Sequence, residues 1–220
     1  MGDWIELDTP QGAINAWRAD PARPSRGALV VVQEIFGVNA HIRSVADKFA
    51  QAGFVAVAPA LFDPVERDVE LGYDEAGVAR GRELTAALGF DRAVALVDAA
   101  AGMLQREGLR AGAVGFCWGG SIAFLANTRL GLPAVSYYGG RTVGFLDEAT
   151  RAPMLFHFGE HDPIIPPDAV AAHRAKQPGA TIHVYPAGHG FNCEARRDFD
   201  PDSAALAWQR SIAFLDEALK

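Results

Sequence analysis

Short runs of apolar residues alternate with longer amphipathic stretches along most of the chain. Each run is bounded by Gly or Pro and has the length of a buried strand. The runs are residues 28–32, 54–58, 113–116, 134–138, 154–158 and 181–185. Strands that alternate with helices in this way are typical of a mostly parallel central sheet with helices on both faces. The pattern therefore predicts an α/β fold.

The stretches between these runs have the spacing of helices. The clearest, residues 41–52, places Ile42 and Phe49 on one face, with Asn39 as the N-terminal cap and Gly53 as the stop. The other predicted helices are residues 74–88, 91–107, 121–129, 167–176 and 203–219. The helix at residues 74–88 is polar and contains glycine, so its pattern is the weakest of the set.

The first thirty residues have a different pattern. Residues 4–7 and 14–17 alternate apolar and polar positions around a turn at residues 9–12, which predicts an N-terminal hairpin. No repeat, low-complexity tract or linker interrupts the series that follows. We therefore predict one domain that spans residues 1–220.

Composition excludes several classes of protein. Half of the residues are hydrophobic and 21% are charged, as in a globular protein, and the net charge of -7 argues against a nucleic-acid partner. The longest apolar stretches are broken by Pro59 or Asp98 and are shorter than the ~20 residues that a bilayer requires. The N-terminus lacks the pattern of a signal peptide, and two cysteines suit a reducing compartment. We expect a cytoplasmic protein that does not bind a membrane.

The strongest chemical signal is the segment Gly-Phe-Cys-Trp-Gly-Gly at residues 115–120, which follows a predicted strand and precedes a predicted helix. It has the form of a nucleophile elbow in which Cys117 replaces serine. Glycines flank the nucleophile because a Cβ atom at those positions would collide with the neighbouring strand or helix. The helix N-terminus that follows favours the attacking thiolate. The alternative is a buried structural cysteine in a glycine-rich turn.

An acid and a histidine follow the nucleophile in the chain order of the α/β hydrolases. Asp162 lies in a turn after the run at residues 154–158, where Pro163 prevents a helix from starting. Glu160 in the same turn and Asp168, which we expect to open the next helix, are the alternatives. His189 follows the run at residues 181–185 in a glycine-flanked loop, which leaves it free to reach the nucleophile.

The remaining histidines fit other roles. His157 and His183 lie inside predicted strands, whereas His41 and His173 lie on predicted helices. The pair formed by His157 and His161 has a spacing that suggests a metal, but on a strand and a turn the two side chains would not share a face. We therefore predict no metal and no cofactor.

Four motifs make the chain similar to the dienelactone hydrolase family over nearly its whole length. The motifs are Gln-Glu-Ile-Phe-Gly at residues 33–37, the elbow at 115–120, residues 159–166, and Ala-Gly-His-Gly-Phe at 187–191. The resemblance implies an α/β-hydrolase fold and a carboxymethylenebutenolidase activity, which opens a small enol lactone through a Cys-His-Asp triad. Composition and spacing alone indicate only a cysteine enzyme of acyl transfer.

The resemblance also implies roles around the nucleophile. Glu34 follows the first apolar run, where it is either a surface residue or, as in the family, the partner of the resting thiol. In the family, substrate displaces that glutamate and so promotes thiolate formation. The backbone N–H groups of Ile35 and Trp118 would form the oxyanion hole in the position that this fold uses.

The substrate-binding end departs from the family pattern. Classical members hold the lactone's carboxylate with two arginines, and the position of one of them, four residues after the histidine, is occupied here by Cys193. Arg196 and Arg197 could replace it, and Arg80 or Arg82 could correspond to the other. Each is otherwise an ordinary solvated charge.

Other readings therefore remain. A general carboxylesterase or a lactonase for another small acyl substrate is the main alternative, and a non-catalytic binding module of the same fold is the second. Tyr73, Tyr137 and Tyr138 either line the pocket or pack in the core. We expect a monomer or a weak dimer.

Overall fold

The computed structural model describes residues 1–220 as two compact units. The first unit comprises residues 1–112 with the last two residues of the chain, and the second comprises residues 113–218. The boundary falls inside strand β5 (Ala111–Phe116), not in a linker. The single domain predicted from the sequence stays a prediction.

The first unit contains the predicted hairpin and a parallel strand pair. Its strands follow one another in the order β1, β2, β4, β3. Their bounds are β1 (Asp3–Leu7), β2 (Ile14–Ala19), β3 (Ala28–Val32) and β4 (Val55–Pro59). β1 and β2 are antiparallel, as are β2 and β4, whereas β3 runs parallel to β4. β3 and β4 are buried along their whole length, which explains why they lack polar positions.

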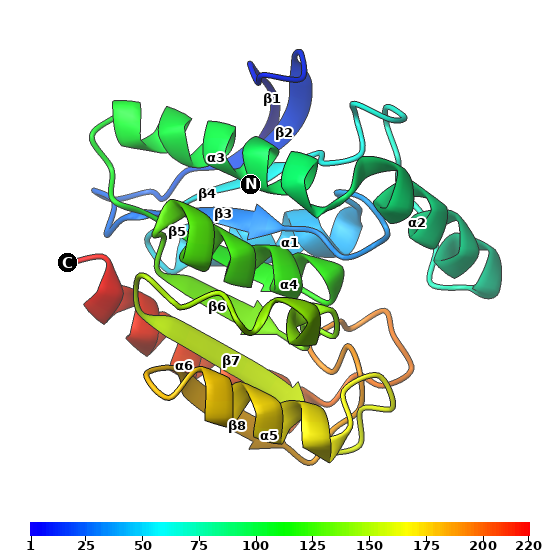
Figure 1. Ribbon diagram of the computed structural model, residues 1–220. Helices are drawn as coiled ribbons and strands as arrows, with labels where there is room; N and C mark the ends of the chain where they lie inside the picture. Colours follow the sequence, from blue (N-terminus) through cyan, green and yellow to red (C-terminus); the bar gives the residue numbers. More distant parts are fainter. The chain divides into compact units, whose positions relative to one another are not determined.

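Helices α1 (Ala40–Gln51) and α3 (Phe90–Arg106) pack on opposite faces of these strands (Figure 1). The α1 cap is as predicted, because the Asn39 side chain accepts a hydrogen bond from the backbone N–H of Ile42. Helix α2 (Glu75–Leu88) begins after Asp74, which caps it in the same way. The predicted bounds of these helices are wrong by one residue at most.

The second unit is a parallel sheet with the strand order β5, β6, β7, β8. The bounds of the last three strands are β6 (Ala134–Tyr137), β7 (Met154–Gly159) and β8 (Thr181–Tyr185). Helices α4 (Trp118–Leu125) and α5 (Pro167–Lys176) lie in front of the sheet in Figure 1, and α6 (Pro201–Ala218) lies behind it. The carboxyl ends of the parallel strands therefore share one edge, where the connecting loops gather.

The prediction for the helix after the elbow is wrong at both ends. Helix α4 begins at Trp118, three residues before the predicted start, because Gly119 and Gly120 lie inside its first turn. After Leu125 the helix widens into a π-helical turn (Ala126–Leu130). The early start places Cys117 directly at the N-terminus of the helix.

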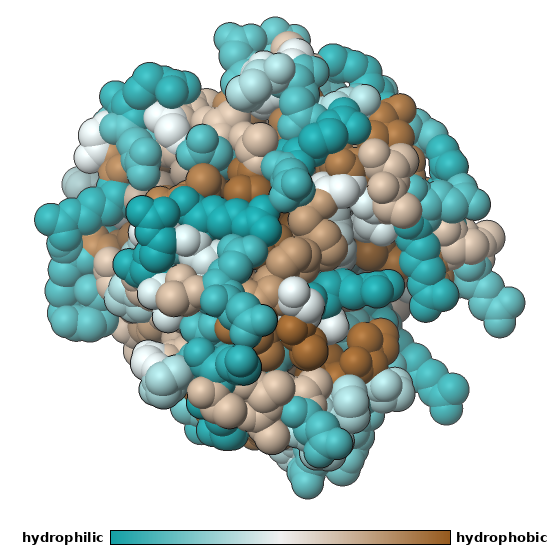
Figure 2. Space-filling view, in the orientation of Figure 1, coloured by the Kyte–Doolittle hydropathy of each residue, from teal (hydrophilic) through white to brown (hydrophobic).

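The surface in Figure 2 is largely hydrophilic, with smaller hydrophobic areas between the polar side chains. The larger exposed apolar side chains include Trp4 and Ile164, with exposed fractions of 47% and 52%. Within the chain, no helix has both the length and the apolar character that crossing a membrane would require.

Candidate active site

Cys117 lies in a strained turn between β5 and α4. Its φ of +53° and ψ of -117° are backbone angles that residues other than glycine rarely adopt. A Cβ atom on Gly115 would lie 1.9 Å from the carbonyl oxygen of Gly119, and one on Gly120 would lie 2.6 Å from that of Tyr137. The close approach of strand and helix therefore requires glycine on both sides of the cysteine.

Three side chains of the second unit form one hydrogen-bonded chain. The Nε2 atom of His189 lies 3.1 Å from the sulfur of Cys117. Its Nδ1 atom lies 2.7 Å from the Oδ2 atom of Asp162. Both Asp162 and His189 are buried, with exposed fractions of 4%. Bulk water therefore competes little for these hydrogen bonds.

The two carboxylate oxygens of Asp162 have different partners. The backbone N–H of Ile164 donates to Oδ1 at 2.8 Å, which closes the turn after β7 and leaves Oδ2 for His189. The alternatives for the acid, Glu160 and Asp168, are exposed at the surface. Asp162 is the one of the three that is hydrogen-bonded to the histidine.

The charges around His189 oppose the effect of its burial. Burial lowers the pKa of the imidazole, but the neighbouring Cys117 sulfur and the Asp162 carboxylate outweigh it and raise the pKa of His189 to about 10. The arrangement therefore stabilises an imidazolium that faces two acidic partners.

The histidines that sequence reasoning set aside lie elsewhere in the second unit. His157 is fully buried inside β7, where its ring nitrogens share hydrogen bonds with the hydroxyls of Tyr185 and Ser211. His173 is fully buried on α5, and its Nδ1 donates to the carbonyl of Ala169. Neither histidine takes part in the hydrogen bonds that link Asp162, His189 and Cys117.

Several predicted site residues belong to the first unit. Glu34 follows β3 and is 1% exposed, so the interpretation of it as a surface residue is wrong. Gly81 of α2 lies so close to the backbone of Ile35 that a Cβ atom would come within 2.2 Å of its carbonyl oxygen. Arg80 forms ion pairs with two glutamates, and Arg82 is exposed. The predicted pairing of Ile35 with Trp118 stays a prediction.

One of the predicted arginines lies beside the histidine loop. Gly190, next to His189, has a φ of +82°, and a Cβ atom there would lie 2.6 Å from Nε of Arg196. The guanidinium group of Arg196 therefore crosses the backbone of this loop. Arg197 is exposed, and Cys193 is fully buried.

Tyr137 and Tyr138 are fully buried. They therefore pack in the core and do not line a pocket that is open to solvent. Tyr73 is half-buried, and its hydroxyl accepts a hydrogen bond from the Asn39 side chain. From the sequence alone, an aromatic residue at a strand end gave no signal that separates lining a pocket from packing in the core.

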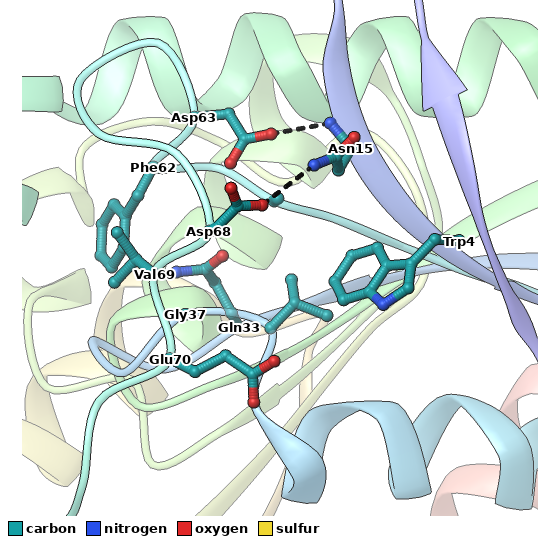
Figure 3. A pocket seen from close by; sticks show the side chains of 11 residues that line it. Trp4, Asn15, Gln33, Gly37, Phe62, Asp63, Asp68, Val69 and Glu70 are labelled. Carbon is teal, nitrogen blue, oxygen red and sulfur yellow. Dashed lines mark hydrogen bonds between the residues drawn. The ribbon is translucent and has the colours of Figure 1, made fainter.

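Sequence reasoning missed a cavity of about 130 Å³ in the first unit (Figure 3). Its wall includes Trp4 and the carboxylates of Asp63, Asp68 and Glu70. The Asp63 side chain accepts a hydrogen bond from the backbone N–H of Asn15 at 2.7 Å. Burial raises the pKa of Asp63. This carboxylate thereby ties the loop after β4 to β2, which is a structural role.

The fold and the site together define a class of protein. Parallel strands flanked by helices, with an elbow after β5 and the acid and histidine in the loops after β7 and β8, are the α/β-hydrolase fold predicted from the sequence. A crystal structure from Klebsiella pneumoniae subsp. pneumoniae MGH 78578, named provisionally as a dienelactone hydrolase, is similar to it with a TM-score of 0.86. The two chains are 30% identical, and 97% of each is covered.

The chain belongs to the dienelactone hydrolase family, whose profile matches residues 14–219. It is 29% identical over 230 residues to carboxymethylenebutenolidase 1 of Cupriavidus pinatubonensis (strain JMP 134 / LMG 1197), with 98% of this chain and 97% of that one covered. It is 30% identical over 235 residues to a Bradyrhizobium protein named provisionally as 2-oxo-3-(5-oxofuran-2-ylidene)propanoate lactonase, with 97% and 93% covered. The protein is therefore a hydrolase of this family.

Proposed function

We propose that the protein opens a small enol lactone of the dienelactone type with Cys117 as nucleophile, His189 as acid and base, and Asp162 as the group that orients the histidine. The observation that carries the proposal is the buried hydrogen-bonded chain of 2.7 Å and 3.1 Å that ends on the strained cysteine. Chain order and partner geometry match the triad arrangement of this fold.

In the first half of the reaction, the Cys117 thiolate attacks the carbonyl carbon of the lactone and forms a tetrahedral adduct. The carbon–oxygen bond of the ring then breaks, and His189 gives its proton to the leaving oxygen. The leaving oxygen of a lactone stays attached to the acyl group, so the product of this half is a ring-opened thioester on Cys117. Asp162 holds Nδ1 so that Nε2 faces the sulfur and the leaving oxygen.

In the second half, His189 takes a proton from a water molecule, which attacks the thioester carbonyl. The carbon–sulfur bond breaks, a carboxylic acid is released, and the proton on His189 re-forms the pair with the Cys117 thiolate. In both halves the oxygen of the same carbonyl becomes negatively charged in the tetrahedral adduct. We assign its stabilisation to the backbone N–H groups of Trp118 and Ile35. Trp118 is the first residue of α4 and directly follows Cys117, which is the position that this fold uses for one donor of the oxyanion hole.

Glu34 completes the proposed machinery in the role that the family implies. Its burial supports this role over that of a solvated surface charge, because a buried carboxylate needs a compensating partner. In the proposal it holds Cys117 in a less reactive resting state and is displaced when the substrate enters.

Arg196 is our candidate for binding a carboxylate on the lactone. It lies against Gly190, one residue from His189, and it is half-buried, whereas Arg80, Arg82 and Arg197 are exposed. The lactonase relative from Bradyrhizobium is named for a substrate that carries a propanoate group, which gives an anionic lactone precedent among the relatives. A guanidinium binds such a group through two parallel hydrogen bonds.

The proposal is tested by hydrolysis of dienelactone beside p-nitrophenyl acetate with purified protein. We expect higher kcat/KM for the lactone, and a covalent adduct on the peptide that contains Cys117 when the reaction is quenched early and analysed by mass spectrometry. Preference for p-nitrophenyl acetate would favour the alternative of a general carboxylesterase. The observation behind that alternative is that a fully buried cysteine, Cys193, stands at the position of a family arginine.

A non-catalytic binding module of the same fold is the remaining alternative. It is tested with iodoacetamide, which alkylates thiolates much faster than thiols. Rapid labelling of Cys117 at neutral pH supports the enzyme, and complete protection of Cys117 together with no turnover of either ester contradicts it.

A further inference from the structure

Tyr138 has a backbone conformation that its side chain does not favour. Its φ is +41°, and besides Asp68 and Cys117 it is the only residue other than glycine with a positive φ in this chain. The side chain is fully buried. A strained conformation at a bulky buried residue persists only where its surroundings fix it, and such positions often serve a functional site.

The backbone on both sides of Tyr138 is fixed by the catalytic half of the second unit. Its N–H donates to the carbonyl oxygen of His157 at 2.8 Å, and the preceding carbonyl, that of Tyr137, accepts from the N–H of Cys117 at 3.0 Å. The next residue, Gly139, is so crowded that a Cβ atom would lie 2.7 Å from Oγ of Ser136. The turn after β6 is therefore tied to both the elbow and β7.

The strained turn directs the ring of Tyr138 to the proposed catalytic imidazole. The centroids of the Tyr138 and His189 rings are 5.1 Å apart, and the planes meet at 63°, which is an edge contact. On another side the Tyr138 ring meets that of Phe191, at 5.4 Å and 72°. Phe191 therefore packs against the ring that contacts His189, the residue that holds two hydrogen bonds at once.

We infer that Tyr138 is a positioning residue whose ring holds the His189 imidazole between Asp162 and Cys117; this role rests on the proposed function. The last torsion of a histidine side chain is soft, so the two hydrogen bonds alone leave the ring free to tilt. A packed aromatic ring removes that freedom. The left-handed backbone of Tyr138 aims the ring at the imidazole, which an extended residue at the end of β6 would not do.

The test compares three variants. Tyr138→Phe keeps the ring, Tyr138→Leu removes it, and Phe156→Leu is the matched control because Phe156 is equally buried in the same unit and has no ring contact with His189. Ring contacts of this type correspond to about 2- to 12-fold in rate. We expect Tyr138→Leu to lower kcat within that range with KM unchanged, while the other two variants keep kcat within about twofold of wild type.

A second readout does not depend on turnover. The rate of Cys117 alkylation by iodoacetamide is measured against pH, with the label located by mass spectrometry. Loss of the Tyr138 ring should move the half-maximal pH of alkylation upward, because a mobile imidazolium stabilises the thiolate less well. Phe156→Leu should leave the profile unchanged although it also creates a cavity.

The outcomes are distinct. Wild-type kcat and an unchanged alkylation profile in Tyr138→Leu would overturn the role, and so would equal losses in Tyr138→Phe and Tyr138→Leu, which would assign the effect to the hydroxyl. If Tyr138→Leu does not fold, Tyr138→Met supplies the same comparison with a more adaptable side chain. If the wild-type protein turns over neither ester, the proposed function fails, and the alkylation profiles alone decide the role of Tyr138.

Discussion

Two histidines of the second unit are buried to a similar degree but differ in their electrostatic surroundings. His189 bonds to an aspartate and a cysteine, and these partners raise its pKa to about 10 in spite of burial. His157 bonds to the hydroxyls of Tyr185 and Ser211. Burial, with smaller effects from His183 and Arg210, holds the pKa of His157 well below its usual range.

The comparison shows that burial alone does not decide what a histidine does. Desolvation favours the neutral imidazole at both sites. Only the partners differ: the Cys117 sulfur and the Asp162 carboxylate raise the pKa of His189, whereas His157 has only hydroxyl partners. His157 therefore serves as a neutral link between β7, β8 and α6, whereas the partners of His189 favour its charged form. The predictions below alter the partners of one histidine or the other.

The largest effect is expected from Cys117→Ala, which removes one partner of His189. Loss of a triad nucleophile lowers kcat by about four to six orders of magnitude. The same change removes the sulfur that raises the pKa of His189, so this pKa should fall, which imidazole NMR signals will measure. A folded variant that retains the wild-type kcat would end the assignment of Cys117.

Asp162→Asn should have the next largest effect. The amide can still accept the hydrogen bond from the N–H of Ile164, so the turn is kept, but it removes the charge that faces His189. Replacement of a triad aspartate by asparagine lowers kcat by about 10⁴-fold. Glu160→Gln, in the same turn and exposed, is the matched control and should keep its activity. Similar losses in both variants would contradict the role of Asp162.

Arg196→Ala tests whether the loop of the charged histidine also carries a binding site for anions. A charge-assisted hydrogen bond is worth about 1.5 to 3 kcal/mol, which corresponds to roughly 10- to 150-fold in kcat/KM for an anionic lactone. A neutral ester should lose little. Arg197→Ala is the control, because that side chain is exposed. An unchanged ratio of anionic to neutral activity in Arg196→Ala would indicate a neutral substrate.

The smallest effect concerns stability and its dependence on pH. Because the pKa of His157 is depressed below about 6.5, the unfolded chain binds a proton there first, and stability falls as pH decreases below that value. The raised pKa of His189 makes stability depend on pH in the opposite direction. Its contribution to stability is complete below about pH 6.5 and is lost as pH rises towards about 10.

His157→Phe separates the two contributions. At pH 8 the variant should be less stable by about 1 to 3 kcal/mol, because its hydroxyl partners lose a buried hydrogen bond. Between pH 8 and pH 5 the variant should lose less stability than the wild type, because it lacks the histidine whose pKa is lowered in the folded state. Urea unfolding at both pH values measures this, with exposed His161→Gln as the control. A larger decrease in the free energy of unfolding between pH 8 and pH 5 in His157→Phe than in the wild type would refute the explanation.

Much of the fold could be predicted from the sequence because buried strands appear as uninterrupted runs of apolar residues. β3 and β8 have the predicted bounds, and α5 does as well. The order of cysteine, aspartate and histidine was also visible, since each follows a strand of this kind. The start of α4 was missed because glycines usually interrupt a helical pattern, whereas here they allow its close approach to β5 and β6.

Other parts of the site depend on contacts between residues far apart in sequence. Neither the left-handed backbone of Tyr138 nor its contact with His189 can be seen in the pattern, because an apolar run that ends in two tyrosines is typical of any buried strand. The position of Arg196 over Gly190 depends on the fold of a loop without periodicity. The same holds for the hydroxyl partners of His157, one of which comes from α6.

The glycine contacts around the elbow restrict how this protein can be adapted to new substrates. Any larger side chain at Gly115 or Gly120 would force β5, α4 and β6 apart, so substitutions there remove the folded protein before they can alter selectivity. Libraries for laboratory evolution should leave these positions constant. Diversity belongs in the loops after β6, β7 and β8, where exposed residues such as Val143 and Ile164 can change without moving the cysteine.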